Sequence, residues 1–317
     1  MKKIYNNVFD LIGNTPILKL LKYHTYQKYN LYAKCEMLNP TLSIKDRIVL
    51  SMLRDYEKSG ILKPGMKIYE ASSGNTGTSL AMIGSVLGYE VIITVPYKTS
   101  QEKITTIKAY GATVIVCPNG VSTKSSEHYN NKAKILCDRD EKGLYFNQYE
   151  SMMNVNTHFE STAAEIWDQM SGQIDILIAA ASSGGTITGI SKFLKEKNKN
   201  IKVILADPVG SVFFNHFNNQ KHISSSYQVE GAGKDKVCSI HDFNFIDEVI
   251  QFTDEEAFLA AKSLAVKEGL LSGGSSGGVL CVADKIMKKL SKDKFKPINI
   301  VVVLPDSGFK YLSKVFI

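Results

Sequence analysis

Three segments rich in glycine and serine have the composition to bind a negatively charged ligand. They are residues 72–77 (SSGNTG), 182–186 (SSGGT) and 272–278 (SGGSSGG). Each follows a strand-like or loop segment and opens a helix-like one. Backbone N–H groups and the helix dipole attract anions at such junctions. A single segment of this kind is more often a plain turn, but three in one chain favour a phosphorylated ligand.

The signatures of nucleotide-binding loops are not found in the sequence. No G-x-G-x-x-G follows a strand-like segment, since residues 231–236 read GAGKDK, and there is no G-x-x-x-x-G-K-[ST]. The phosphorylated ligand is therefore not identified by these patterns.

Strand-like and helix-like segments alternate along the chain, which predicts an α/β fold with parallel, buried strands. Thr99 with Glu102, and Thr253 with Glu256, have the spacing of helix capping boxes. We expect helices from these threonines to Tyr110 and Lys267, and a domain boundary near 145–155. Other helices are expected over 78–88, around 158–170, and after residues 186 and 278. The expected strands are 67–70, 90–96, 112–116, 175–181, 202–206 and 298–304.

The composition is that of a globular protein rather than a membrane or secreted one. The 317 residues are 44% hydrophobic and 22% charged, which is compatible with one or two domains. The longest apolar runs, such as 300–304, are much shorter than the roughly 18 residues of a membrane span. The first 13 residues lack the apolar segment of a secretory signal. We expect a cytoplasmic protein without membrane contacts.

Charge and cysteine content exclude two further classes. The net charge is +7, but the lysines are dispersed, and the densest stretches, 192–197 and 285–289, have the pattern of helix C-terminal ends. No nucleic-acid-binding signature accompanies them, so no nucleic-acid partner is expected. The five cysteines are scattered without C-x-x-C spacing, which predicts reduced, buried thiols and neither a disulfide framework nor a metal site.

Seven segments, in this order, resemble the pyridoxal-phosphate (PLP) enzymes of the cysteine synthase and cystathionine β-synthase family. The resemblance covers nearly the whole chain. It implies fold type II, like the tryptophan synthase β chain, with two α/β domains of parallel or mixed sheets flanked by helices and PLP in the cleft between them. The expected domains are 41–149, and 1–40 together with 150–317. The seven segments are NP(39–40) with SIKDR(43–47), SSGNTG(72–77), NQY(147–149), SSGGTITG(182–189), EGAG(230–233), GGSSG(273–277) and LPDSG(304–308).

The resemblance assigns roles to particular residues. Lys45 matches the Schiff-base lysine, which also moves the α-proton of the substrate, and Asp46 and Arg47 are expected to hold its segment. Asn75 matches the residue that bonds the ring hydroxyl of PLP. The phosphate loop corresponds to Ser182, Ser183, Gly184, Gly185 and Thr186, where the family usually has Gly-Thr-Gly-Gly-Thr. The substrate contacts correspond to Ser72, Ser73, Thr76, Gln148 and Gly231.

Ser275 matches the residue that faces the pyridine nitrogen of PLP. A carboxylate there would keep the nitrogen protonated, whereas a neutral hydroxyl leaves it largely unprotonated. We expect this to favour elimination at the β-carbon over transamination.

Several positions depart from the family pattern. The segment Thr41-Leu42-Ser43 replaces an approach to the lysine that commonly contains glycine. Glu230 and Asp235 resemble cystathionine β-synthase more than cysteine synthase, yet Lys234 stands where an aromatic residue is usual and Cys238 where a proline is common. Asp235 would activate a water or thiol, receive a substrate ammonium, or lie solvated in a loop.

The resemblance implies β-replacement or β-elimination on O-acetylserine, serine or cysteine, with sulfide or a thiol as the second substrate. Three alternatives stay open: sulfide-producing conversion of cysteine to serine or lanthionine, a serine or threonine dehydratase, and a non-catalytic binding or docking protein. A homodimer is expected, with serine acetyltransferase as a possible partner. We expect neither an N-terminal haem-binding extension nor a C-terminal regulatory domain.

Overall fold

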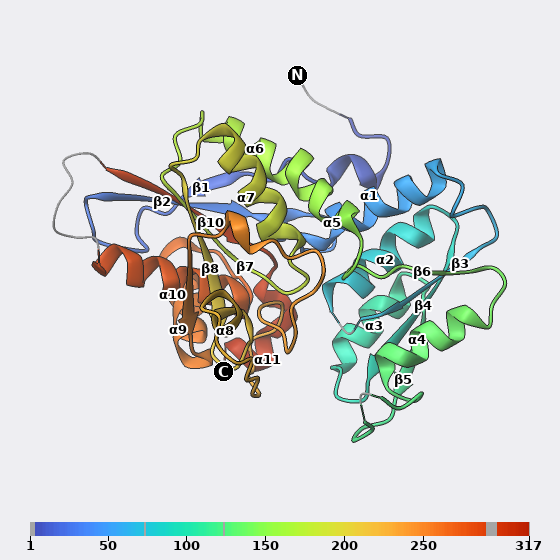
Figure 1. Ribbon diagram of the computed structural model, residues 1–317. Coiled ribbons are helices and arrows are strands. Elements are labelled where there is room, and N and C mark those ends of the chain that lie inside the picture. The colour runs from blue at the N-terminus through green and yellow to red at the C-terminus, as the bar shows by residue number, and fades with distance from the viewer. Residues whose placement is uncertain (1–3, 73, 123, 290–296, 317) are drawn as a thin grey trace. The chain divides into compact units, whose positions relative to one another are not determined.

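The computed structural model describes residues 4–72, 74–122, 124–289 and 297–316. The chain forms two compact units, coloured by residue number in Figure 1. Unit 1 comprises the residues up to Ile12 and Asn39–Gln148, and unit 2 comprises Gly13–Leu38 and Tyr149–Ile317. The domain division expected from the sequence stays a prediction.

Unit 1 is built on a four-stranded parallel sheet in the order β5-β4-β3-β6. Its strands are β3 (Lys67–Ala71), β4 (Glu90–Pro96), β5 (Thr113–Cys117) and β6 (Gly143–Tyr145). The helices of this unit are α1 (Lys45–Lys58), α2 (Asn75–Val86), α3 (Gln101–Ala109) and α4 (Tyr129–Asp138), preceded by a 3-10 turn at Val8–Leu11. The expected strands at 67–70, 90–96 and 112–116 are confirmed within one residue.

Unit 2 is built on a six-stranded sheet in the order β1-β2-β10-β7-β8-β9. Only the pairing of the short edge strand β1 with β2 is antiparallel among these. The strands are β1 (Ile17–Lys19), β2 (Tyr29–Cys35), β7 (Ile176–Ala180), β8 (Lys202–Pro208), β9 (Glu248–Phe252) and β10 (Ile298–Leu304). The buried central strands carry near-continuous apolar sequences, as parallel sheets covered on both faces require.

Helices cover both faces of this larger sheet. α9 and α10 lie together on one side, and α6 and α7 lie on the other (Figure 1). The helices of unit 2 are α5 (Met152–Thr157), a π-helix (His158–Ala163), α6 (Ala164–Gln169), α7 (Gly185–Lys197), α8 (Phe213–Phe217), α9 (Asp254–Glu268), α10 (Gly274–Lys289) and α11 (Leu312–Val315). The 3-10 turns are Glu36–Leu38, Phe243–Phe245 and Gly308–Tyr311.

The two predicted capping boxes have different outcomes. Thr253 caps α9 as expected, because its side chain accepts from the Glu256 N–H and the Glu256 carboxylate accepts from the Thr253 N–H. The box at Thr99 is wrong. Ser100 is the N-cap of α3, and the Thr99 hydroxyl instead donates to the carbonyl of Pro96 in the preceding turn.

The cysteines and lysine-rich stretches lie where the sequence predicts them. All five cysteines are buried and free. Lys195 and Lys197 lie in the last turn of α7, and Lys288 and Lys289 in the last turn of α10, where cations complement the helix dipole. Among the described residues, no helix has both the length and the apolar character needed to cross a bilayer.

Candidate active site

Lys45 is the first residue of α1, at the end of a tightly held turn. The buried carboxylate of Asp46 accepts from the Thr41 N–H at 2.7 Å, from the Thr41 hydroxyl, and from the Ser79 hydroxyl of α2 at 2.5 Å. These bonds tie the turn before α1 to α2 and fix the backbone from which Lys45 projects. Leu42 has φ 61° within this turn, a conformation that glycine adopts at far lower cost.

The segment between β3 and α2 presents backbone N–H groups at a helix N-terminus. The Ser72 hydroxyl accepts from the N–H groups of Gly74 and Gly77, and Asn75 is the first residue of α2. A Cβ on Gly77 would lie 2.7 Å from the Ser72 carbonyl, so the segment can close onto α2 only because residue 77 is glycine. Ser73 lies outside the described residues.

Thr76 and Gln148, 72 positions apart in the sequence, are brought together in unit 1. The Thr76 hydroxyl donates to Oε1 of Gln148 at 2.8 Å, and both side chains are buried. This bond fixes the orientation of the Gln148 amide. The arrangement suits a pair that acts on one ligand, and their expected contact with the substrate carboxylate stays a prediction.

The predicted phosphate loop joins β7 to α7 in unit 2. Gly184 is the N-cap of α7, has φ 99°, and offers no side-chain cap. The first N–H groups of a helix have no acceptor within the helix, so Gly184, Gly185 and Thr186 present donors together with the positive end of the helix dipole. This is the arrangement that binds phosphate groups.

Ser275 lies in the first turn of α10, also in unit 2, and faces the loop at residues 230–234. It is 1% exposed. A Cβ on Gly231 would lie 3.7 Å from Ser275 Oγ. Two residues further, the Gly233 N–H donates to the carbonyl of Ala181, directly before the phosphate loop. Gly231, Ser275 and the phosphate loop are therefore neighbours.

Lys234 and Asp235 follow that contact. The Lys234 ammonium lies 3.9 Å from the centroid of the Tyr149 ring, a cation–π contact. Asp235 is exposed. Of the three alternatives that the sequence left open for this residue, exposure is compatible with a solvated loop position. Burial raises the pKa of the nearby Cys238 thiol, so this thiol stays protonated at neutral pH.

The imidazole of His241 packs against the phosphate loop on another side. A Cβ on Gly184 would lie 2.7 Å from this ring, so only glycine fits beneath it. Burial lowers the pKa of His241 to about 4, which keeps the ring neutral at physiological pH. The ring therefore shields the loop from solvent without adding a charge.

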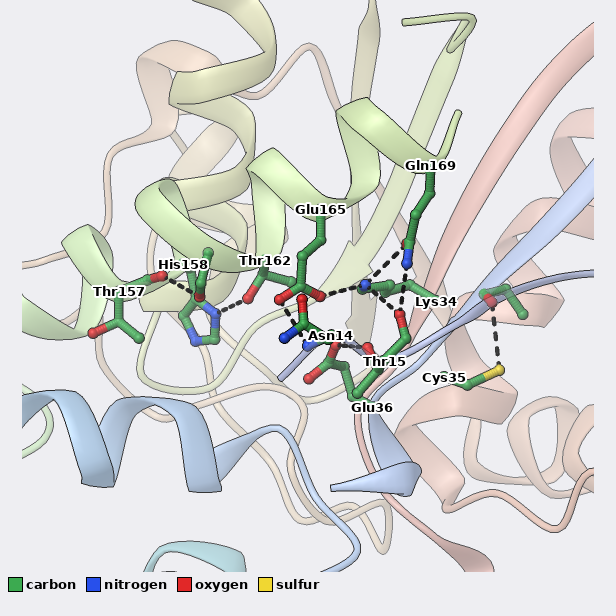
Figure 2. A network of polar contacts seen from close by, with 12 residues as sticks. Asn14, Thr15, Lys34, Cys35, Glu36, Thr157, His158, Thr162, Glu165 and Gln169 are labelled. Carbon is green, nitrogen blue, oxygen red and sulfur yellow. Dashed lines mark hydrogen bonds and ion pairs between the residues drawn. The ribbon is translucent and has the colours of Figure 1, made fainter. Parts of the chain in front are cut away.

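Two buried side chains contact the hydroxyl groups of the phosphate loop. They were not identified from the sequence. Nδ2 of Asn154 donates to the Ser183 hydroxyl at 3.1 Å. Nε2 of His158 lies 3.2 Å from the Thr186 hydroxyl, and its Nδ1 lies 2.9 Å from the Thr162 hydroxyl, as Figure 2 shows for the ring and Thr162. Asn154 and His158 are four residues apart, hence on one helix face, and this spacing was the available sequence signal.

These observations agree with what PLP requires of a protein. The phosphate of PLP needs an open helix N-terminus, and α7 supplies one. The pyridine nitrogen of PLP is an acceptor, and the hydroxyl of the buried Ser275 is a possible donor to it. Within the described residues, no group of three or more His, Cys, Asp or Glu side chains could hold a metal ion.

The fold defines the class of protein. The chain superimposes on the crystal structure of O-ureido-L-serine synthase with a TM-score of 0.91 and 28% identity, covering 99% of this chain and 96% of that one. For O-acetyl serine sulfhydrylase isoform 3 from Entamoeba histolytica, the TM-score is 0.89 at 32% identity, covering 99% and 91%. The expected α/β architecture of fold type II is thereby confirmed.

Sequence comparison identifies the family. Residues 8–306 match the family described as pyridoxal-phosphate dependent enzyme. The chain is 43% identical to cystathionine beta-synthase from Apis mellifera over 98% of this chain and 61% of that protein. It is 37% identical to the O-acetylserine dependent cystathionine beta-synthase of Bacillus subtilis, covering 98% and 97%. It is also 34% identical to cysteine synthase from Dictyostelium discoideum, covering 99% and 84%.

The chain belongs to the pyridoxal-phosphate dependent enzyme family, within its cysteine synthase and cystathionine β-synthase branch. Its cofactor is pyridoxal 5'-phosphate. This membership argues against the non-catalytic alternative considered from the sequence. The chain spans about three-fifths of the length of the Apis mellifera relative.

Proposed function

We propose that this chain catalyses β-replacement on a three-carbon amino acid, O-acetylserine, serine or cysteine, with sulfide or a thiol as the second substrate. The observation that carries the proposal is Ser275, a buried neutral hydroxyl at the start of α10 beside Gly231 and close to the phosphate loop. The names of the relatives, which include cysteine synthase and cystathionine beta-synthase, support the same reaction class.

In this mechanism, PLP when bound delocalises the electrons released at the α-carbon of the substrate. The N-terminus of α7 would hold the phosphate through backbone N–H groups. Ser275 would donate a neutral hydrogen bond to the ring nitrogen, which would favour loss of the β-substituent over transamination. Thr76, through its bond to Gln148, orients an amide toward the substrate carboxylate.

Lys45 is the proposed base. Its amine would remove the α-proton of the substrate and return it after the thiol or sulfide has added to the β-carbon. Asp46 keeps the start of α1 in place through its bonds to Thr41 and Ser79, so the lysine side chain moves from a fixed backbone. Asn75, at the start of α2, is proposed to bond the ring hydroxyl.

The test is product analysis with each amino acid in turn, supplied with sulfide or homocysteine. We expect cysteine or a thioether as the product, and loss of turnover by at least about a thousandfold in Lys45→Ala. Lys58→Ala, at the exposed other end of the same helix, is the matched control and should keep normal turnover. Retained turnover in Lys45→Ala, or pyruvate as the sole product, would contradict the proposal, and pyruvate would favour the dehydratase.

A second candidate is the conversion of cysteine to serine or lanthionine with release of sulfide. The observation that favours it is the exposed Asp235 carboxylate, two residues beyond the Gly233–Ala181 bond and therefore in contact with water. If Asp235 activates that water, Asp235→Asn should slow sulfide release from cysteine alone and leave replacement with an added thiol unchanged. Equal rates of sulfide release in the variant and the wild type would show that Asp235 does not activate the water, and would remove the observation that favours conversion of cysteine to serine.

The assembly and location are also proposals. We propose a homodimer that acts on small amino acids and sulfur compounds in the cytoplasm, with serine acetyltransferase as a possible partner. Five buried free thiols support a reducing compartment. Size-exclusion chromatography with light scattering tests the dimer, which should have twice the 35.1 kDa mass of the chain.

A further inference from the structure

The Thr186 hydroxyl can serve a phosphate group only if its proton points the right way. A hydroxyl has one proton to donate and lone pairs to accept with. If Thr186 donated to His158, its oxygen would face the phosphate with lone pairs, which repel an anion. If His158 donates to Thr186 instead, the Thr186 proton is available to the phosphate. The direction of the 3.2 Å contact between His158 Nε2 and Thr186 Oγ1 therefore matters.

The direction of that contact depends on the other nitrogen of the ring. A neutral imidazole carries one proton, so Nε2 can donate only when Nδ1 is an acceptor. Nδ1 lies 2.9 Å from the Thr162 hydroxyl, which can donate to it. His158 and Thr162 are both 0% exposed, so water does not compete for these positions.

The local backbone holds the ring in this position. His158–Ala163 form a π-helix, a rare element that often occurs at functional sites. α7 packs directly on it, because a Cβ on Gly189 would lie 2.8 Å from His158 Cβ and 2.4 Å from the Val155 carbonyl. α5, which leads directly into the π-helix, places Asn154 so that its Nδ2 donates to the Ser183 hydroxyl, leaving the Ser183 proton to be donated elsewhere.

We propose that Thr162 and His158 are positioning residues that make Thr186 a hydrogen-bond donor to the cofactor phosphate. The bonds run in one direction: Thr162 donates to Nδ1 of His158, and Nε2–H donates to Thr186, whose proton is thereby directed to the phosphate. Asn154 does the same for Ser183. Thr162 acts through the tautomer of His158, whose Nδ1 its hydroxyl contacts. The inference rests on Ser182–Thr186 being the phosphate loop.

The first test measures how much the phosphate contributes to binding. Apoenzyme is titrated with PLP and with pyridoxal, which lacks the phosphate, and the ratio of the two dissociation constants is compared between variants. In Thr162→Val, Nδ1 loses its donor, the ring takes the other tautomer, and Thr186 turns its proton to His158. We expect PLP to bind roughly ten times more weakly and the affinity for pyridoxal to be unchanged.

Two variants make the result decisive. Thr157→Val is the matched control, because it removes a neighbouring hydroxyl that donates to the Met153 carbonyl and does not contact the His158 ring. It should leave the ratio unchanged. Thr186→Val tests the underlying assignment. An unchanged ratio in Thr186→Val would show that the Thr186 hydroxyl gives the phosphate no hydrogen bond and would overturn the inference, although the backbone N–H groups of the loop could still hold the phosphate. Weaker PLP binding in Thr186→Val with an unchanged ratio in Thr162→Val would overturn only the positioning roles.

The second test needs no variant and so does not depend on folding of a mutant. The chain has six histidines, so ¹⁵N correlation spectra of the imidazole nitrogens are sparse enough to assign. We expect His158 to be protonated at Nε2 alone in the PLP-loaded wild type. A ring protonated at Nδ1 alone, or at both nitrogens, would overturn the inference.

Discussion

At the scale of single residues, two buried side chains, Ser275 and Asp46, are central to the proposed site. Ser275 is a neutral hydroxyl residue that is 1% exposed, and Asp46 accepts three hydrogen bonds that hold the turn before Lys45. Both were identified from short motifs, because each lies in a segment whose order along the chain is distinctive. The sequence motifs therefore identified these two site residues, but not the residues with which they form contacts.

The buried carboxyl of Asp207 lowers the stability of the folded protein when it is ionised. This carboxyl, at the end of β8, is fully buried, and one of its oxygens accepts from the Phe214 N–H at 2.9 Å. Burial raises the pKa of Asp207 to about 6. The folded state therefore binds this proton more tightly than the unfolded state does, and its contribution to stability is lost as pH rises from about 4 to 6.

We predict that Asp207→Asn stabilises the protein at high pH. The amide oxygen can still accept from Phe214, and the penalty of an ionised buried group disappears. The gain over wild type should grow between pH 4 and 6 and reach about 2–3 kcal/mol above pH 7. Urea unfolding at pH 4 and pH 8 measures this difference, with the exposed Asp168→Asn as the control. A gain equal at both pH values would mean that the burial cost has another origin.

At the scale of elements, most strands and helices followed from local pattern. The runs at 298–304 and 90–96 are apolar throughout most of their length, and both are strands buried in parallel sheets. β2 shows where local pattern fails. It contains Lys34, which is 0% exposed because its ammonium bonds Glu165, Gln169 and the Thr15 carbonyl (Figure 2). A buried lysine satisfied by a residue 131 positions away has no local signature.

Contacts between residues far apart in the sequence also explain why Asn154 and His158 were not identified from the sequence. His158 and Thr186 are 28 positions apart, and Asn154 and Ser183 are 29 apart. Each pair forms only after α5 and the π-helix have packed on α7. Sequence motifs locate the phosphate loop, because its glycines are constrained locally, but the support behind the loop is a product of tertiary packing.

The position of α10 depends on its close approach to neighbouring elements. A Cβ on Gly278 would lie 2.3 Å from the ring of Phe252, which is fully buried on β9. We predict that Gly278→Ala lowers the free energy of unfolding by about 1–3 kcal/mol through overpacking. Phe252→Leu should also destabilise the protein, but the double variant should be more stable than the sum of the two losses predicts. Simple additivity in urea denaturation would show that the two side chains do not compete for this space.

At the scale of the whole molecule, the proposed cofactor residues are divided between the two units. Lys45 and Asn75 belong to unit 1, and the phosphate loop and Ser275 to unit 2. A ligand that binds only the folded state stabilises it by about 2.7 kcal/mol at a concentration one hundred times its dissociation constant. Because all of these residues are proposed to act on one cofactor, we expect bound PLP to raise the free energy of unfolding of both units.

Hydrogen exchange of the apoenzyme and the PLP-loaded enzyme tests this expectation. PLP should slow amide exchange in α1 and α2 of unit 1 as well as in α7 and α10 of unit 2. In Lys45→Ala the protection of α1 should fall, while that of α7 is retained through the phosphate. The exposed-end variant Lys58→Ala should exchange like the wild type throughout. Protection confined to α7 and α10 in the wild type would mean that the residues of unit 1 do not hold the cofactor, and the role proposed for Lys45 would then fail.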